Sequence, residues 1–268
     1  MKYTNNDGKG RDTASDKGRD FSPRGAAAVF SVKPDDVVFI NIEGVPELAS
    51  TNDLSDTMRQ LWESLPHPAS LSTDEAYRAM GLCAEFGKVA CVTAGVIRSR
   101  AGETEPYFIT STYAADDERQ VLCDFSEMIG NFFSTSPRSR FVCGHGIHAS
   151  DVPFFAKRLI VNRLPLPALF DKHGRRWLDE NVIDTADFWA MGNADAPATA
   201  APLLASVLGI DVDPTDYDAI EAATLYHDDH DLRSLAQRSE RKVLVAARIF
   251  RAMRGESPIS GDHVIRKE

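Results

Sequence analysis

Two polar side chains interrupt an apolar stretch near the start of the chain, residues 35–44 (DDVVFINIEG). Asn41 and Glu43 lie two residues apart, so in a β-strand they point to the same face as Val37 and Phe39. Burying an amide and a carboxylate at the end of a strand costs free energy unless they are solvated, paired with other polar groups, or part of a functional site. Because α/β proteins commonly place their sites at the carboxyl ends of strands, the pair marks a candidate site. The alternative is a strand end that emerges into water.

A second candidate is the loop and helix start GHGIHASDVPFF, residues 144–155, which follows the apolar RFVCG. His145, His148 and Asp151 are spaced three apart, and imidazole and carboxylate groups are common ligands of divalent metals. The spacing is therefore compatible with a metal site. The alternative is that Asp151 serves as the N-terminal cap of the helix that follows.

The third candidate is the long helical stretch near the carboxyl end. It begins with the polar run YHDDHD, residues 226–231, which we interpret as a solvated helix start with acidic residues in its first turn. Arg238 and Lys242 lie four apart beside the apolar stripe, so they stack on consecutive turns of one face. An ordinary amphipathic boundary, where long cationic side chains cover apolar surface, explains this pair equally well.

The elements that position these residues follow from hydrophobic periodicity. Three early strands, of which the second and third form an antiparallel hairpin, precede alternating helices and strands, which predicts one α/β domain with a mixed β-sheet flanked by helices. The expected strands are 35–44, 88–98, 105–112 and 140–144. The expected helices are 53–65, 73–83, 116–133, 151–163, 200–208, 215–226 and 231–254.

Composition sets outer limits on function. The 268 residues are 43% hydrophobic, which excludes uniform disorder, and the net charge of −10 excludes a chain that binds nucleic acid simply by being basic. We expect a disordered polar tail over 1–28, the domain over 29–256 and a C-terminal tail over 257–268. No apolar run is long enough for a membrane span, and the polar start is not a secretory signal. Four cysteines without a CxxC spacing predict buried free thiols and a cytoplasmic location.

Five phrases, taken in order, resemble one family. They are VVFINIEGVPEL, EFGKVACVTAGV, FVCGHGIHASDVPFF, DENVIDTADFW and the run from Tyr226 to Phe250. The chain resembles, over about residues 36–254, the predicted 3′–5′ exonucleases related to the exonuclease domain of family B DNA polymerases, in the DEDD group of the ribonuclease H-like superfamily. The resemblance implies a ribonuclease H-like sheet in which the strand of Asn41 is central, between strands 88–98 and 140–144.

The chemistry of that group needs four carboxylates that hold two divalent cations for an in-line displacement at phosphorus. Carried over residue by residue, the resemblance leaves two of the four: Glu43 and Asp151 match. Asn41 stands where the first aspartate belongs, Arg238 at the tyrosine and Lys242 at the last aspartate. A neutral amide and an ammonium group cannot replace anionic ligands of hard cations. The resemblance therefore implies a degenerate exonuclease that lacks hydrolytic activity, with no cofactor; any ion that still binds would use Glu43 and Asp151.

Three functions remain open. The first is this degenerate exonuclease, with a groove for a single-stranded 3′ end contacted by Arg238 and His145, and with Lys242 paired to Glu43, Asp151 or both. The second is an active exonuclease that holds Mg²⁺ or Mn²⁺ through substitute ligands. The third is a scaffold with no nucleic-acid role that acts through an unidentified protein. None of the three involves a membrane. The candidate substitute ligands are His148, Asp184, Asp187 and Asp231.

Overall fold

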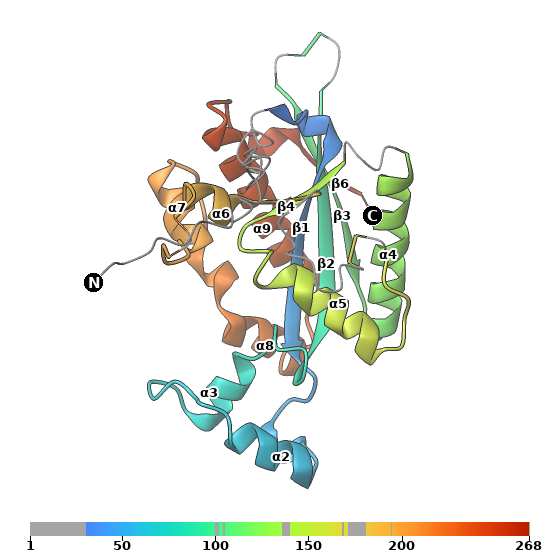
Figure 1. Ribbon diagram of the computed structural model, residues 1–268, viewed down its shortest axis with the longest axis vertical. Helices are drawn as coiled ribbons and strands as arrows, with labels where there is room; N and C mark the ends of the chain where they lie inside the picture. The colour runs from blue at the N-terminus through green and yellow to red at the C-terminus, as the bar shows by residue number, and fades with distance from the viewer. Residues whose placement is uncertain are drawn as a thin grey trace, which may run out of the picture.

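The computed structural model describes residues 31–99, 102–103, 105–135, 140–167, 169–170, 181–193 and 195–267 (Figure 1). The predicted polar tail, residues 1–28, lies outside the described residues. Among the helices within these ranges, none is both long and apolar enough to cross a membrane.

A mixed six-stranded sheet forms the centre of the fold, in the order β5-β4-β1-β2-β3-β6. As predicted, β1 is central: it pairs antiparallel with β2 and parallel with β4, while β2 and β3 form the expected antiparallel hairpin (Figure 1). The fold class is therefore α/β, with the mixed sheet flanked by helices that the sequence predicts and the central strand order that the family resemblance implies. The strands are β1 (Val37–Pro46), β2 (Gly87–Arg98), β3 (Tyr107–Ala114), β4 (Phe141–Gly144), β5 (Val182–Asp184) and β6 (Val264–Lys267).

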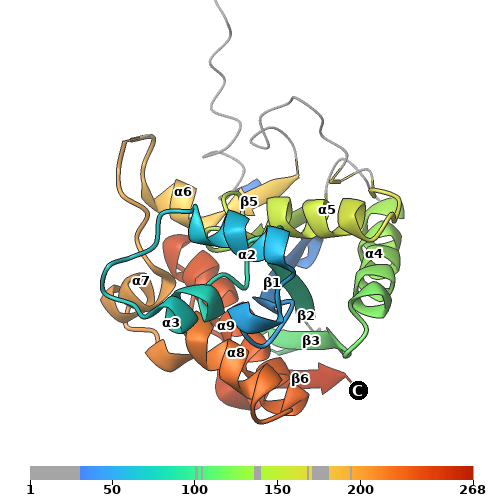
Figure 2. The same cartoon turned by 90° about the horizontal axis from the view of Figure 1, so that it is seen from below.

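Helices cover both faces of the sheet, as Figure 2 shows. On one face lie α4 (Glu118–Ser134) and α5 (Asp151–Val161); on the other lies the long α9 (Leu232–Met253), with α7 (Ala201–Val207) and α8 (Ala219–His227) packed beside it. The remaining helices are α2 (Asp56–Glu63), α3 (Thr73–Arg78) and α6 (Thr185–Trp189), with 3₁₀ turns η1 (Pro34–Asp36), η2 (Thr51–Asp53), η3 (Pro214–Tyr217) and η4 (Gly261–His263).

The side chains of β1 point alternately to the two faces of the sheet, and this determines which helix each of them contacts. Val38 and Ile40 belong to the core under α4 and α5, whereas Phe39 packs against Phe250 of α9, with ring centroids 5.4 Å apart. Successive strand residues face opposite sides. The polar positions that share the face of Phe39 are therefore directed at α9.

A lobe built from residues 47–86 is inserted between β1 and β2 and carries α2 and α3 (bottom of Figure 1). It joins the sheet through an unusually close backbone contact, since a Cβ atom added to Gly44 would lie 2.3 Å from the carbonyl oxygen of Gly81. The register of β1 against β2 also shifts between Glu43 and Gly44. Only glycine therefore fits at residue 44.

Several elements differ from the prediction. The segment 257–268, expected to be a tail, contributes β6, which pairs in parallel with β3. The three-residue β5, parallel to β4, was not predicted, because so short a strand shows no periodicity of its own. The helix expected over 73–83 ends at Arg78, where the chain turns to bring Gly81 against Gly44.

All four cysteines are free thiols. Cys91 and Cys143 are buried as predicted, but Cys83 is only half-buried and Cys123 is exposed, because it lies on the solvent side of α4. Burial, together with the charge of the nearby Glu43, raises the pKa of Cys91 to about 12. The cytoplasmic location inferred from the cysteines stays a prediction.

Candidate functional site

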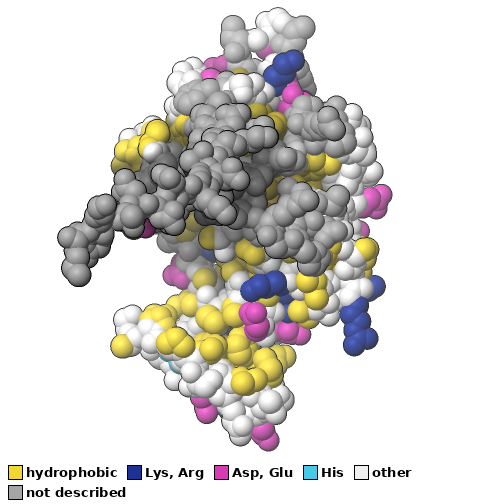
Figure 3. All heavy atoms as spheres, viewed as in Figure 1, with side chains coloured by type: hydrophobic (Ala, Val, Ile, Leu, Met, Phe, Trp, Pro, Cys, Tyr) yellow, Lys and Arg dark blue, Asp and Glu magenta, His cyan; other side chains and the backbone are white. Residues whose placement is uncertain are grey.

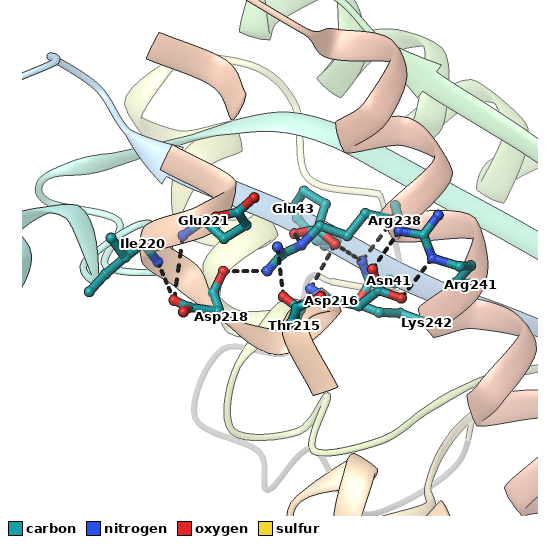
Figure 4. Close-up of polar contacts among 12 residues, drawn as sticks. Asn41, Glu43, Thr215, Asp216, Asp218, Ile220, Glu221, Arg238, Arg241 and Lys242 are labelled. Carbon is teal, nitrogen blue, oxygen red and sulfur yellow. Dashed lines mark hydrogen bonds and ion pairs between the residues drawn. The ribbon is translucent and has the colours of Figure 1, made fainter. Parts of the chain in front are cut away.

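Glu43 is the centre of a cationic cluster between β1 and α9 (Figure 4). Its side chain is 3% exposed, and the Lys242 ammonium lies 2.7 Å from Oε1. The Arg238 guanidinium approaches from the preceding turn of α9, with Nε 3.7 Å from Oε2. The ion pair between Lys242 and Glu43 confirms the pairing predicted from the sequence. A buried carboxylate needs such partners, because an isolated charge is not tolerated in the interior.

Asn41 adds a neutral donor to the same carboxylate. Its Nδ2 donates one hydrogen bond to Glu43 Oε1 and another to Ser239 Oγ, both at 3.0 Å. An aspartate in this position has no hydrogen to donate and would place a second anion beside Glu43. The amide therefore pairs directly with Glu43, which an aspartate in this position could not do.

Asp151 serves the backbone of β1. Its Oδ1 accepts a hydrogen bond from the Ile42 N–H at 2.9 Å, and its Oδ2 accepts one from Ser150 Oγ at 2.5 Å. The pairing of β4 with β1 stops at Phe39, so the N–H of Ile42 needs another acceptor. The residue at the N-cap of α5 is Ser150, and Asp151 is the first helical residue, which contradicts the interpretation of Asp151 as a cap.

The burial of Asp151 has an electrostatic consequence. Desolvation raises the pKa of this carboxyl above its ordinary value, and the charge of Glu43 adds to the rise. The two hydrogen bonds and the positive charge of Lys242 oppose it. Asp151 and Glu43 thus repel each other across the site, and Lys242 is the cation that offsets this repulsion.

Arg238 is turned inward and offers no surface to a phosphate. Its side chain is 2% exposed, and its two terminal nitrogens donate to backbone carbonyls, to Thr215 O at 3.0 Å and to Asp218 O. Next to it, Arg241 binds both carboxylate oxygens of Asp216, with Nε 2.7 Å from Oδ2. The two arginines hold the η3 segment over the site (Figure 4). In this conformation Arg238 is occupied within the chain, and its contact with nucleic acid stays a prediction.

His145 is also engaged within the chain. Its Nδ1 lies 2.9 Å from Thr185 Oγ1 and its Nε2 lies 2.7 Å from the carbonyl oxygen of Thr199. Both ring nitrogens therefore have partners, so neither is free for a nucleic acid in this conformation. The histidine links the loop after β4 to α6 and to the segment that precedes α7.

The residues that the family resemblance brings together do converge. One small cavity is lined by Asn41, Asp151 and Lys242, with His145 and Tyr217 completing its polar wall. It measures about 30 Å³, which is room for a single water molecule and far below the roughly 300 Å³ at which small-molecule sites begin. Tyr217 covers the ammonium of Lys242, with the nitrogen 5.3 Å from the ring centroid, and burial raises the pKa of its hydroxyl.

These groups do not fit a pair of divalent cations. Glu43 Oε1 accepts from Asn41 and Lys242, and both oxygens of Asp151 accept hydrogen bonds from protein donors. Hard cations require several free oxygen ligands, usually anionic. An ammonium at hydrogen-bonding distance of the central carboxylate would also repel them. The structure therefore disagrees with the two-metal arrangement of the family.

The substitute ligands proposed for an active enzyme divide into two groups. His148, Asp184 and Asp187 lie together beside β5, with their ligand atoms within 4.8 Å of one another. Asp231 is elsewhere: it caps α9, accepting from Ser234 N at 2.9 Å and from Ser234 Oγ at 2.6 Å. It precedes Lys242 by about three helical turns, roughly 16 Å along the axis.

Sequence reasoning missed the residues of η3 and the role of Ser239. The Asp-Pro turn that opens η3 was a readable signal, since Asp213 accepts a hydrogen bond from the Thr215 N–H and proline is tolerated in a first turn. That signal predicts a turn but not its packing over the site. Arg238 contacts backbone carbonyls, and the residue types at those positions do not indicate such a contact in the sequence.

No protein-family model matches this sequence, and no curated protein matches it. Among solved structures, the chain is similar to the family B DNA polymerase from the hyperthermophilic archaeon Pyrobaculum calidifontis, at 13% sequence identity and a TM-score of 0.43. The match covers 81% of this chain and 24% of the polymerase chain, so this chain spans about a quarter of the polymerase's length. At this level, similarity assigns neither a family nor an activity.

Proposed function

We propose that the chain is an exonuclease-like protein whose two-metal site is degenerate and does not hydrolyse nucleic acids. The observation that carries the proposal is the contact of 2.7 Å between Lys242 Nζ and Glu43 Oε1. This ion pair, together with the amide of Asn41, uses the carboxylate that the family resemblance assigns to the metals. The small volume of the remaining cavity supports the same conclusion, because a nucleotide does not fit.

The test is digestion of a labelled single-stranded oligonucleotide by the full chain with Mg²⁺ or Mn²⁺. The matched control is Glu43→Gln, which removes the last family carboxylate on β1 while keeping its size. We expect equal, background-level products from both proteins. Stepwise loss of 3′ nucleotides by the wild type that disappears in Glu43→Gln would overturn the proposal and support the active alternative.

Nucleic-acid binding at this site stays a prediction. In the present conformation Arg238 and His145 are occupied within the chain, so a 3′ end would have to displace η3 and break the pairs of Arg238 and Arg241. Fluorescence anisotropy with a single-stranded oligonucleotide over a salt series measures this directly. Binding that weakens steeply with salt would indicate phosphate contacts.

A second candidate function, a protein-binding scaffold without a nucleic-acid role, is favoured by one observation. Four exposed leucines gather in the 47–86 lobe, where Figure 3 shows hydrophobic side chains clustered over the lower part of the molecule. They are Leu48, Leu61, Leu65 and Leu82. Exposed apolar patches of this kind often mark interaction surfaces. Absence of oligonucleotide binding at low salt would favour this function over the nucleic-acid-binding one.

A further inference from the structure

A cluster of three ligand-type side chains lies at the carboxyl edge of β4 and β5, apart from the Glu43 cluster. His148 comes from the loop between β4 and α5, Asp184 ends β5, and Asp187 lies one turn later in α6. One ligand atom from each lies within 4.8 Å of the other two. None of the three contacts Glu43, Asn41 or Lys242 in the part of the chain that the structure describes.

Asp184 is held rigidly in this cluster. Its Oδ1 accepts hydrogen bonds from Gly146 N at 2.7 Å and Ala186 N at 2.9 Å, and its Oδ2 accepts one from His148 N at 2.9 Å. Its side chain is 1% exposed. A carboxylate oxygen has two lone pairs, so Oδ2 keeps one that is not used. Ligands fixed by such outer hydrogen bonds are typical of metal sites.

His148 is oriented through one nitrogen only. Its Nδ1 lies 2.5 Å from Asp187 Oδ2 and 3.7 Å from Asp184 Oδ2. Its Nε2 is buried and makes no hydrogen bond within the described ranges. The contacts of Nδ1 direct this nitrogen between the carboxylates of Asp184 and Asp187.

We propose that His148 Nδ1, Asp184 Oδ2 and Asp187 Oδ2 bind one divalent transition-metal ion of the Zn²⁺ or Co²⁺ class. Metal–ligand distances of about 2.0–2.2 Å place the atoms of a tetrahedral site roughly 3.3 Å apart. The separation of 3.7 Å from Asp184 already suits this. The contact with Asp187 must open by less than about 1 Å, which a rotation of its 55% exposed side chain permits.

The ligand set selects the class of ion. Imidazole nitrogen suits zinc, cobalt and nickel, whereas Mg²⁺ and Ca²⁺ prefer oxygen ligands alone. Water completes the coordination at the fourth position. Such an ion would tie the loop of residues 145–150, which begins with His145 and leads into Asp151, to the start of α6. It shares no ligand with the Glu43 cluster, so the inference does not depend on the proposed function.

The experiment uses the full chain after treatment with a chelator. Co²⁺ is titrated while its visible absorption is followed, and Zn²⁺ is titrated by calorimetry, with Mg²⁺ as the comparison ion. We expect one ion per chain, no comparable binding of Mg²⁺, and a loss of affinity of at least about tenfold in both His148→Ala and Asp187→Asn. The matched control is Asp195→Asn, an exposed aspartate outside the cluster, which should bind as the wild type does.

Thermal melts without metal confirm that each variant is folded, and Asp187→Asn changes an exposed side chain that the core does not need. Absence of saturable binding to the wild type would overturn the inference, as would binding that survives both ligand substitutions. Binding that requires Glu43 rather than His148 would also overturn it, and would count separately against the degenerate site. Binding that requires His148 and Asp187 leaves that proposal untouched.

Discussion

Replacing Lys242 by methionine tests whether its ammonium serves as the permanent counter-charge of Glu43. Methionine keeps the apolar stem of the side chain up to the ε position and removes the ammonium group with its charge and its hydrogen bond. The two partners are 13% and 3% exposed, so little water is available to replace the lost contact. The carboxylate would then depend on Asn41 and on Arg238 at 3.7 Å.

The magnitude follows from the geometry. Two unit charges at 2.7 Å attract by roughly 6 kcal/mol at an effective dielectric constant of about 20. Desolvation offsets much of this, but removing one partner of a buried pair typically costs about 3–5 kcal/mol, because the other charge is left behind. With Arg238 still present, we expect Lys242→Met to lower the free energy of unfolding by about 3 kcal/mol.

The assay is urea denaturation of wild type, Lys242→Met, Glu43→Gln and the double variant, which together form a double-mutant cycle. We expect a coupling energy of about 2–3 kcal/mol. The matched control is Lys157→Met, since Lys157 pairs with Glu85 at 3.5 Å on the surface with both side chains more than half exposed. That change should cost less than about 1 kcal/mol. A cost for Lys242→Met no larger than the control, or strictly additive single effects, would refute the reasoning.

Three further predictions concern the same region. Asn41→Asp combined with Lys242→Asp restores the anionic ligands and should give a rise in melting temperature with Mg²⁺ that the wild type does not show, measured by differential scanning calorimetry. Asp151 has a raised pKa in the folded state, so its favourable contribution is complete below the ordinary carboxyl pKa of about 3.9 and is lost as the pH rises through the raised pKa. Asp151→Asn should therefore gain stability relative to the wild type as the pH rises from below about 3.9 through the raised pKa, measured in denaturation series; a constant difference would contradict this. Gly44→Ala should lose at least about 1–3 kcal/mol in the same assay, because its Cβ meets the Gly81 carbonyl at 2.3 Å, whereas Gly130→Ala, where a Cβ has open space, should not be destabilised.

The central strands of the sheet could be predicted because each buries enough residues for a hydrophobic pattern to be visible in the sequence. The two faces of β1 belong to two different core clusters, which the alternation of Val38 and Phe39 shows in the sequence. By contrast, β5 and β6 span three and four residues. Their conformation is set by the strands they pair with: β5 ends at the polar Asp184 and β6 ends in Arg266 and Lys267, so neither shows the apolar run that identifies the four-residue β4.

The site was predictable in part for a similar reason. The convergence of Asn41, Asp151 and Lys242 on Glu43 follows once the order of the strands and the last helix is known. The direction of Arg238 does not, because its partners are backbone carbonyls of residues 215 and 218, about twenty positions away in the chain. Carbonyl groups are present in every residue, so no residue type reveals which of them an arginine will contact.

The placement of the shortest strands at the two ends of the sheet bears on how the protein avoids aggregation. The long apolar strands β1 and β2 are paired on both sides, and β6 covers β3 from Phe108 to Ser111. Among the described residues, the sheet ends at the three-residue β5 on one side and at β6, with its exposed Arg266 and Lys267, on the other. A very short strand and a cationic strand are both poor templates for another chain's strand. Deleting β6 would expose one edge of the eight-residue β3. The backbone N–H and C=O groups left unpaired there would favour strand pairing between molecules.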